Sequence, residues 1–188
     1  GGESNMKGFA FFKKELMESY RTPKAIILIL IFFFCGIMSP LGARYIKEIL
    51  ESTGQLGDFK LPDPTWLDAF AQFYKNNQSL AFITLLLTFM NSVAGEKKSG
   101  TAVLMLSKGL KRRSFIYSKY IAGVIVFLTA YIVNITMTIF YANLLFDDFS
   151  PAALFSSLAV YGLNGAFYIA IAIMASVLAS RPASAAIM

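Results

Sequence analysis

The stretch from Ala25 to Ala43, "AIILILIFFFCGIMSPLGA", decides the fold class, because it contains no Asp, Glu, Lys or Arg. About 20 residues of this kind form a helix that spans the hydrocarbon core of a bilayer. Three more windows without these residues follow it: Leu80–Ala94, Ile121–Phe146 and Ala152–Ala179. We therefore predict an all-α, polytopic membrane protein with four transmembrane helices, at about residues 23–43, 77–95, 115–146 and 151–180.

The composition agrees with this prediction. Of the 188 residues, 56% are hydrophobic and only 15% are charged, and the mean hydropathy is +0.60. In a soluble domain, about a quarter of all residues are charged. The apolar residues are also gathered in blocks rather than spread along the chain. A membrane protein accounts for both observations.

The positive charges are distributed unevenly around the four windows. Thirteen of the 17 Lys and Arg residues lie before the first window, in the segment 95–120, or at Arg181. By the positive-inside rule, these three segments are cytoplasmic. We therefore predict a multi-pass protein of the cell (cytoplasmic) membrane with a cytoplasmic N-terminus. The net charge of +6 then mostly reflects topology, and nucleic-acid binding by the basic loop is the weaker alternative.

The N-terminal segment predicts a helix outside the membrane core. Residues 1–5 precede the first Met and resemble a cloning remnant, so we leave them out of the prediction. In "MKGFAFFKKELMESY", residues 6–20, Lys14, Glu15 and Glu18 fall on one helical face. Such a helix lies in the plane of the membrane interface. We assign residues 6–21 to this helix, with four residues on its apolar face: Phe9, Phe12, Leu16 and Tyr20.

The next residues, "RTPK", mark the entry into the transmembrane domain, residues 22–188. Thr22 suits a helix N-cap and Pro23 suits the first helical position. Ser39–Pro40 should kink or end the first span. Segment 44–76 then lies outside, where Thr65 can cap an amphipathic stretch that carries Trp66, Phe70, Phe73 and Tyr74 on one side. A solvent-exposed loop is the alternative for this segment.

The fourth span has a clear start and a small-residue face. Ser150 and Pro151 suit its cap and first position, after two acidic residues. Gly162, Ala166 and Ala170 recur every four residues, which predicts a helix-packing seam, with a substrate groove as the alternative. The final residues, "ASAAIM", resemble the start of another apolar run. We therefore expect the sequence to be a piece of a longer protein.

The sequence offers no residues for catalysis or metal binding. It contains no His, no P-loop pattern and one cysteine, Cys35, which we interpret as a small packing residue. We predict no catalytic, cofactor-binding or metal site. If the protein moves a substrate uphill, the energy must come from a separate chain or domain.

The basic segment "GEKKSGTAVLMLSKGLKRRSFIYSKY", residues 95–120, contains a short apolar stretch. "GEKKSGT" predicts a turn, and residues 101–108 predict about two helical turns with Ala102, Met105 and Leu106 on one side. Gly109 suits a C-terminal stop, and Ser114 can cap the third span. A solvated loop whose charges only set the topology is the alternative.

Three motifs carry a resemblance to a known family. "RTPK", "GEKKSGT" and "LMLSKGLKRRSFIYSKY" resemble the corresponding stretches of ABC-2-type transporter permeases, the transmembrane subunits of ABC exporters. Two features depart from the family pattern. The family often has Pro where Gly109–Leu110 stands here, and its members have six spans against four here. We interpret the missing spans as truncation at the C-terminus.

The resemblance implies a permease that forms a translocation path and couples to a separate ATPase through the cytoplasmic loop 95–114. It also implies a second permease copy, in a homo- or heterodimer, and contact with the lipid bilayer. A non-transporting membrane scaffold or regulatory subunit is the alternative function. The residues that the resemblance assigns to the ATPase interface are Glu96, Gly100, Thr101, Val103, Leu104, Ser107 and Lys108.

Overall fold

The computed structural model describes residues 2–53, 62–146 and 154–178. Within these ranges there are helices and turns but no strand, and four helical stretches are long and apolar enough to cross a membrane. The predicted all-α, polytopic class is confirmed. The elements are α1 (Gly2–Arg21), α2 (Pro23–Ser52), α3 (Trp66–Asn76), η1 (Asn77–Ala81), α4 (Phe82–Phe89), α5 (Ala94–Lys98), α6 (Thr101–Ser107), α7 (Arg112–Leu145) and α8 (Phe155–Leu178).

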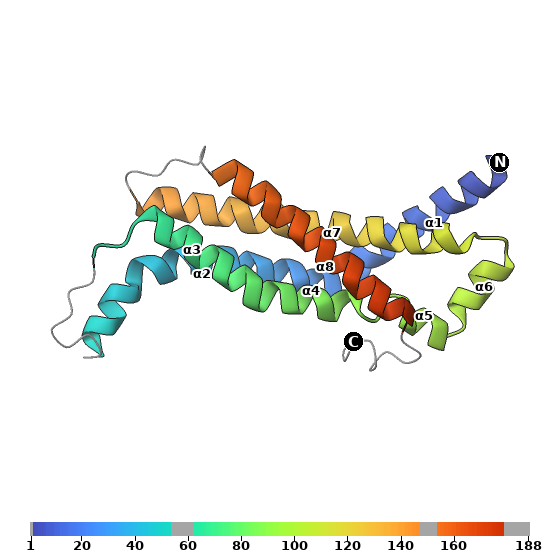
Figure 1. Ribbon diagram of the computed structural model, residues 1–188, viewed down its shortest axis with the longest axis horizontal. Coiled ribbons are helices and arrows are strands. Elements are labelled where there is room, and N and C mark those ends of the chain that lie inside the picture. Colours follow the sequence, from blue (N-terminus) through green and yellow to red (C-terminus); the bar gives the residue numbers. More distant parts are fainter. Residues whose placement is uncertain (1, 54–61, 147–153, 179–188) are drawn as a thin grey trace.

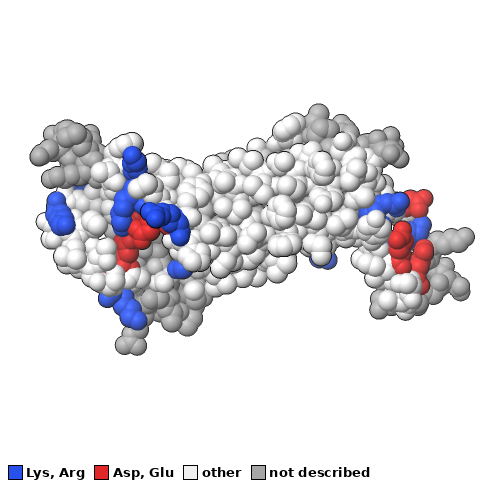
Figure 2. All heavy atoms as spheres, turned by 180° about the vertical axis from the view of Figure 1, so that it is seen from behind, with Lys and Arg blue, Asp and Glu red and all other residues white. Residues whose placement is uncertain are grey.

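The long helices run side by side along the longest axis of the molecule (Figure 1). Helices α1, α5 and α6 gather at one end, together with the start of α7. Figure 2 shows the molecule from the opposite side. The charged side chains visible there cluster at the two ends and leave an uncharged middle. The N-terminal helix and the basic loop therefore share one end, as the charge pattern predicts. Which end faces the cytoplasm stays a prediction.

The first long helix differs from the prediction at its far end. Thr22 is the N-cap of α2 and Pro23 its first residue, as predicted, but α2 continues through Pro40 to Ser52. Proline has no N–H to donate to the carbonyl four residues back, which is that of Gly36. The hydroxyl of Thr138 on α7 lies 3.2 Å from this carbonyl, but its single hydrogen is shared with the nearer carbonyl of Asn134, 3.0 Å away. The helix passes through Pro40 with this partial replacement of the missing donor, and residues 44–52 are helical.

The helix that contains the predicted second span begins before residue 77. Thr65 forms a capping box with Asp68 at the start of α3, and Phe70 and Phe73 are buried on one face of that helix. The helix continues without a break into the π-helix η1 and then α4, so the candidate span covers Trp66–Lys98 rather than 77–95. A π-turn adds one residue to a helical turn and so allows α3 and α4 to remain one rod.

Polar side chains join the first three long helices at the level of η1. Asn134 of α7 donates to the amide oxygen of Asn77 over 2.8 Å, and Asn76 donates to Ser39 of α2 over 3.1 Å. Asn77 and Asn134 are completely buried. Hydrogen bonds between helices are one of the main forces that associate helices inside a membrane. These contacts fix the register of α2 and α3–η1 against α7.

The most buried residues of α8 are Leu158, Gly165, Ile169, Ala172, Ile173 and Ser176. The predicted residues Gly162, Ala166 and Ala170 lie half-buried beside them, and a Cβ on Gly162 would lie 3.3 Å from the Tyr131 ring of α7. That these three residues form a packing seam stays a prediction. Gly165 sits so close to the buried Phe127 ring of α7 that a Cβ would clash with that ring. The large aromatic residues of α7 determine which small residues of α8 are needed, and the α8 sequence alone does not reveal this.

The described ends of α7 and α8 bear on two other predictions. Helix α7 has 34 residues and is about 50 Å long, which is more than the roughly 30 Å of a hydrocarbon core. The predicted third span, residues 115–146, lies almost entirely within this helix. The predicted cap of the fourth span at Ser150–Pro151 and the residues after 178 lie outside the described ranges.

Candidate functional site

The short helix α6 is bounded by two glycines in the left-handed region. Gly100 has φ 76° and is the N-cap of α6, and Gly109 has φ 88° just after its end. Only glycine adopts this region at little cost. The predicted stop at Gly109 is confirmed. The predicted turn "GEKKSGT" is partly wrong, because its first residues form the helix α5.

The two faces of α6 have different surroundings. Ala102 is 6% exposed and packs against the core, whereas Val103 and Leu104 are 67% and 62% exposed. Ser107 and Lys108 are exposed beside them, and Thr101 is half-buried. The residues predicted to form an interface therefore share the outer face of α6 at the charged end of the molecule. An apolar pair at such a place is a candidate contact for another protein.

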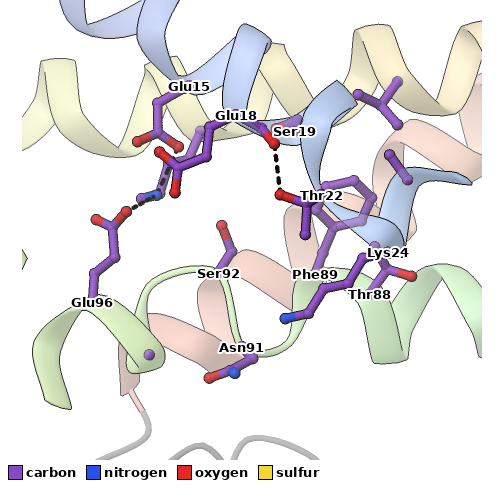
Figure 3. Close-up of a pocket in the computed structure, with 14 residues that line it drawn as sticks. Glu15, Glu18, Ser19, Thr22, Lys24, Thr88, Phe89, Asn91, Ser92 and Glu96 are labelled. Atoms are coloured by element: carbon purple, nitrogen blue, oxygen red, sulfur yellow. Dashed lines mark hydrogen bonds and ion pairs between the residues drawn. The ribbon is translucent and has the colours of Figure 1, made fainter. Parts of the chain in front are cut away.

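Glu96 is the exception, because its side chain points into the protein. Its carboxylate accepts a hydrogen bond from the ammonium of Lys119 on α7 over 2.9 Å (Figure 3). The same ammonium donates to Glu15 of α1 over 2.8 Å. Lys119 is 4% exposed and Glu15 is 6% exposed. We call Glu15, Lys119 and Glu96 the ion cluster; it joins α1, α5 and α7.

The register of α1 on α7 explains how the ion cluster forms. One helical turn before Glu15 and Lys119, the rings of Phe11 and Phe115 stack with their centroids 5.3 Å apart. Residues four apart lie on the same face of a helix, so each stacked ring places one ionic partner beneath it. The Lys119 ammonium also lies 5.3 Å from the Phe115 centroid, within cation–π range.

This packing changes the interpretation of α1. Its face toward α7 carries Phe11 and Glu15, whereas the prediction assigned Glu15 to the outer, polar face. Of the predicted apolar residues, Phe9 is exposed and Tyr20 donates to or accepts from Thr129 over 2.6 Å. Phe12 and Leu16 are half-buried. The helix begins at Gly2 rather than at residue 6. Its position in the membrane interface stays a prediction.

A second lysine balances the charge of the ion cluster. Two carboxylates facing one ammonium leave an excess negative charge, and Lys14 lies 3.6 Å from Glu15 and 2.8 Å from Glu18. Partial burial acts to lower the pKa of Lys14, but its hydrogen bond to Glu18 and the charges of Glu15, Glu18 and Glu96 raise that pKa above the ordinary value. Lys14 therefore stays protonated at neutral pH and compensates part of the excess charge.

A polar cavity of about 280 Å³ lies next to the ion cluster (Figure 3). It opens between α1, the end of α4, α5 and α7, with Phe89 and Val126 on its apolar part. Its polar lining residues are Glu15, Glu18, Ser19, Thr22, Lys24, Thr88, Asn91, Ser92, Glu96 and Lys119. The cavity leaves room beside the ion cluster, so α5 and α1 are joined mainly through Lys119 rather than by close packing.

Helix α8 holds the other side of α5. The hydroxyl oxygen of Ser176 accepts hydrogen bonds from the backbone N–H groups of Val93 and Ala94, over 2.9 Å and 3.0 Å. These groups begin α5 and have no earlier helical carbonyl to bond. Lys97 also donates to the backbone carbonyl of Val177. The α5–α6 loop is thus attached to α1, α7 and α8.

Comparison with known proteins identifies the family. A family model described as "ABC-2 family transporter protein" matches residues 9–188, which is nearly the whole chain. The chain belongs to the ABC-2 transporter family. This ABC-2 family member is also 25% identical over 157 residues to an "Uncharacterized transmembrane protein YxlG" from Bacillus subtilis (strain 168). That match covers 82% of the chain and 61% of the relative, so the chain spans less than two thirds of the relative's length.

The sequence of this ABC-2 protein gave only part of its candidate site. The short apolar pattern before Gly109 predicted the helix α6, and the residues of its outer face were assigned from the family resemblance. Lys119, Glu15 and Ser176 were missed. One signal was present: Phe11 and Glu15 have the same spacing as Phe115 and Lys119, which places a ring and a charge of opposite sign on two matching helix faces.

Replacing Ser176 by Ala is expected to loosen the start of α5. The change removes the acceptor from two buried N–H groups, each of which costs about 1 to 3 kcal/mol when left unpaired. Hydrogen exchange of the Val93 and Ala94 amides should become faster by at least about tenfold, from that same cost. Ser156→Ala, at an exposed position of α8, is the control. Unchanged exchange in Ser176→Ala would show that α8 does not hold the loop.

Proposed function

We propose that the chain is the permease subunit of an ABC exporter and that α6 is its docking element for a separate ATPase. The outer face of α6 is the observation that carries this proposal. It presents Val103 and Leu104 to solvent on a short helix whose opposite face is anchored by Ala102. A pair of exposed apolar residues bordered by Ser107 and Lys108 suits a shallow groove on another protein.

The attachments of α5 provide a route for movement to reach the membrane. A force on α6 passes through Gly100 to α5, which is bound to α7 by Lys119 and to α8 by Ser176. The same lysine binds Glu15, so α1 moves with α7. The chain itself then performs no hydrolysis: ATP is cleaved in the partner, and the long helices respond by tilting.

The remaining features of the proposal follow from the family and from the charge pattern. The N-terminus and α6 are cytoplasmic, the protein resides in the cell membrane, and two permease copies assemble with two ATPase subunits around one translocation path. A cysteine introduced at position 98 and a membrane-impermeant thiol reagent would check the first statement. In right-side-out vesicles, labelling that occurs only after the vesicles are opened supports a cytoplasmic position.

Replacing Val103 and Leu104 together by Asn is expected to abolish binding to the ATPase without unfolding the permease. Hot-spot residues at the centre of an interface cost about 2 kcal/mol or more each when lost, so the affinity should fall at least about a hundredfold. The measurement is co-purification and binding of an ABC ATPase subunit expressed together with the permease. Leu67→Asn, at a position of α3 that is 58% exposed at the other end, is the matched control.

The same experiment separates the permease from the alternative of a scaffold. If the wild-type protein binds the ATPase and changes its rate of ATP hydrolysis, and the double variant does neither, the permease proposal gains support. If the wild type binds the ATPase and Val103→Asn/Leu104→Asn binds it equally well, the assigned role of α6 is contradicted. Failure of the wild-type protein to bind any ATPase would favour the scaffold.

A further inference from the structure

We propose that a groove between α1 and the first turns of α7 binds the phosphate head group of an anionic phospholipid. The groove has a volume of about 380 Å³ and lies outside the α5–α6 loop and the ion cluster. Its lining residues come from α1, from α7 and from Lys111, the N-cap of α7. They are Gly8, Phe9, Phe12, Lys111, Arg113, Ser114, Tyr117, Ser118 and Ile121.

The polar part of the groove has the chemistry of an anion site. Lys111 and Arg113 supply two positive charges, and Ser114 and Ser118 supply two hydroxyl groups. A guanidinium and a lysine ammonium are the usual partners of a phosphate group. No Asp or Glu is found among the described residues that line the groove. The nearby carboxylates of α1, Glu15 and Glu18, line the other cavity instead.

Ser118 is the second observation, independent of the charges. It is 6% exposed, and its hydroxyl has no hydrogen-bond partner among the residues that the structure describes. The side chain is buried except where it lines the groove, so its hydroxyl is free to donate to a group that enters there. A phosphate oxygen is a suitable acceptor. Gly8 keeps the helices close here, because a Cβ on it would lie 2.6 Å from the Ser114 hydroxyl.

The apolar part of the groove selects a lipid rather than a soluble phosphate. Phe9 and Tyr117 are 69% and 64% exposed, and Ile121 is 46% exposed one turn further along α7. Along α7 the groove runs from Lys111 and Arg113 to Tyr117 and then Ile121, about one and two turns further into the helix. An anionic phospholipid matches both parts, with its phosphate at Lys111 and Arg113 and its acyl chains along Tyr117 and Ile121. Basic pockets beside spanning helices bind lipid head groups in this way.

The test compares two double variants of the full chain that lose the same charge from the same end. Lys111→Gln/Arg113→Gln removes the rim of the groove, whereas Lys98→Gln/Arg112→Gln removes two exposed charges that do not line it. Each protein is placed in nanodiscs of phosphatidylcholine with phosphatidylglycerol, and the retained lipid is counted by native mass spectrometry after extraction. The wild type and the control should retain phosphatidylglycerol. The groove variant should retain at least about tenfold less of it per protein.

Two further arms test the hydroxyl and the kind of ligand. Ser118→Ala should weaken retention several-fold, and added glycerol phosphate at millimolar concentration should not displace the lipid. Equal loss of lipid in both double variants would overturn the proposal, because general surface charge would then explain the binding. Unchanged retention in Ser118→Ala, or displacement by glycerol phosphate, would likewise overturn the assignment of a phospholipid to this groove. Unchanged circular dichroism and elution volume show that each variant is folded.

Discussion

Replacing Lys119 by Met is expected to lower the free energy of unfolding by about 3 to 5 kcal/mol, the usual cost of removing one partner from a buried ion pair. Methionine has nearly the length of lysine, so packing changes little. The carboxylates of Glu15 and Glu96 then face each other without the ammonium that lies 2.8 Å and 2.9 Å from them. Their repulsion should release α1 and α5 from α7.

The measurement is thermal unfolding of the purified protein in detergent, followed by the fluorescence of Trp66. Lys98→Met, an exposed position of α5, is the control and should unfold like the wild type. The triple variant Glu15→Gln/Glu96→Gln/Lys119→Met removes both stranded charges and should recover most of the lost stability. If the triple variant is no more stable than Lys119→Met, the loss arises from packing and the ion cluster has been misjudged.

Replacing Gly36 by Ala is expected to destabilise the protein, whereas Gly42→Ala in the same helix should stabilise it slightly. At Gly36 a Cβ would lie 2.6 Å from the backbone oxygen of Asn134, which cannot move without displacing α7. Such overpacking costs about 1 to 3 kcal/mol. At Gly42 the nearest atom to a Cβ is 3.9 Å away, on Gln72, so the gain in helix propensity of about 0.5 to 1 kcal/mol remains.

The two alanine variants differ by one methyl group at two places of one helix, which makes the comparison sharp. Thermal unfolding gives the sign of each change. Hydrogen exchange around Gly36 should also become faster in Gly36→Ala, because displacement of α7 would loosen the packing of α2 at this level. Two variants of equal stability would show that α2 and α7 are not in close contact at this level.

The sequence predicted those parts of the fold that depend on local physical chemistry. The apolar windows identified the four long helices, and "RTPK" placed the junction of α1 and α2 at Thr22–Pro23. The predictions of a helix cap at Thr65 and a helix stop at Gly109 were correct for the same reason. A cap or a left-handed turn depends on only one or two residues. The sequence predicted a kink or an end at Ser39–Pro40, whereas α2 continues to Ser52. The Gly36 carbonyl that Pro40 leaves without a donor lies within reach of Thr138, about a hundred residues later in the chain.

The candidate site was predictable only on its outer side. The helix α6 follows from a short local pattern, whereas its exposed residues were assigned from the family resemblance. The ion cluster depends on which faces of α1, α5 and α7 meet, and a single sequence does not record this. Lys119 was counted with the charges that set topology, so its burial was missed. Glu96 was assigned to the partner interface, but its carboxylate is turned inward to Lys119.

The long separation between the members of the ion cluster bears on how the protein is made. Glu15 and Lys119 are 104 positions apart in the chain. At a synthesis rate of about 5 to 20 residues per second, α1 leaves the ribosome roughly 5 to 20 s before its partner lysine exists. During that interval Glu15 is without its cation and Phe11 without its ring. The α1 end of the molecule is therefore completed late in biogenesis, after two spans and the α5–α6 loop have been synthesised.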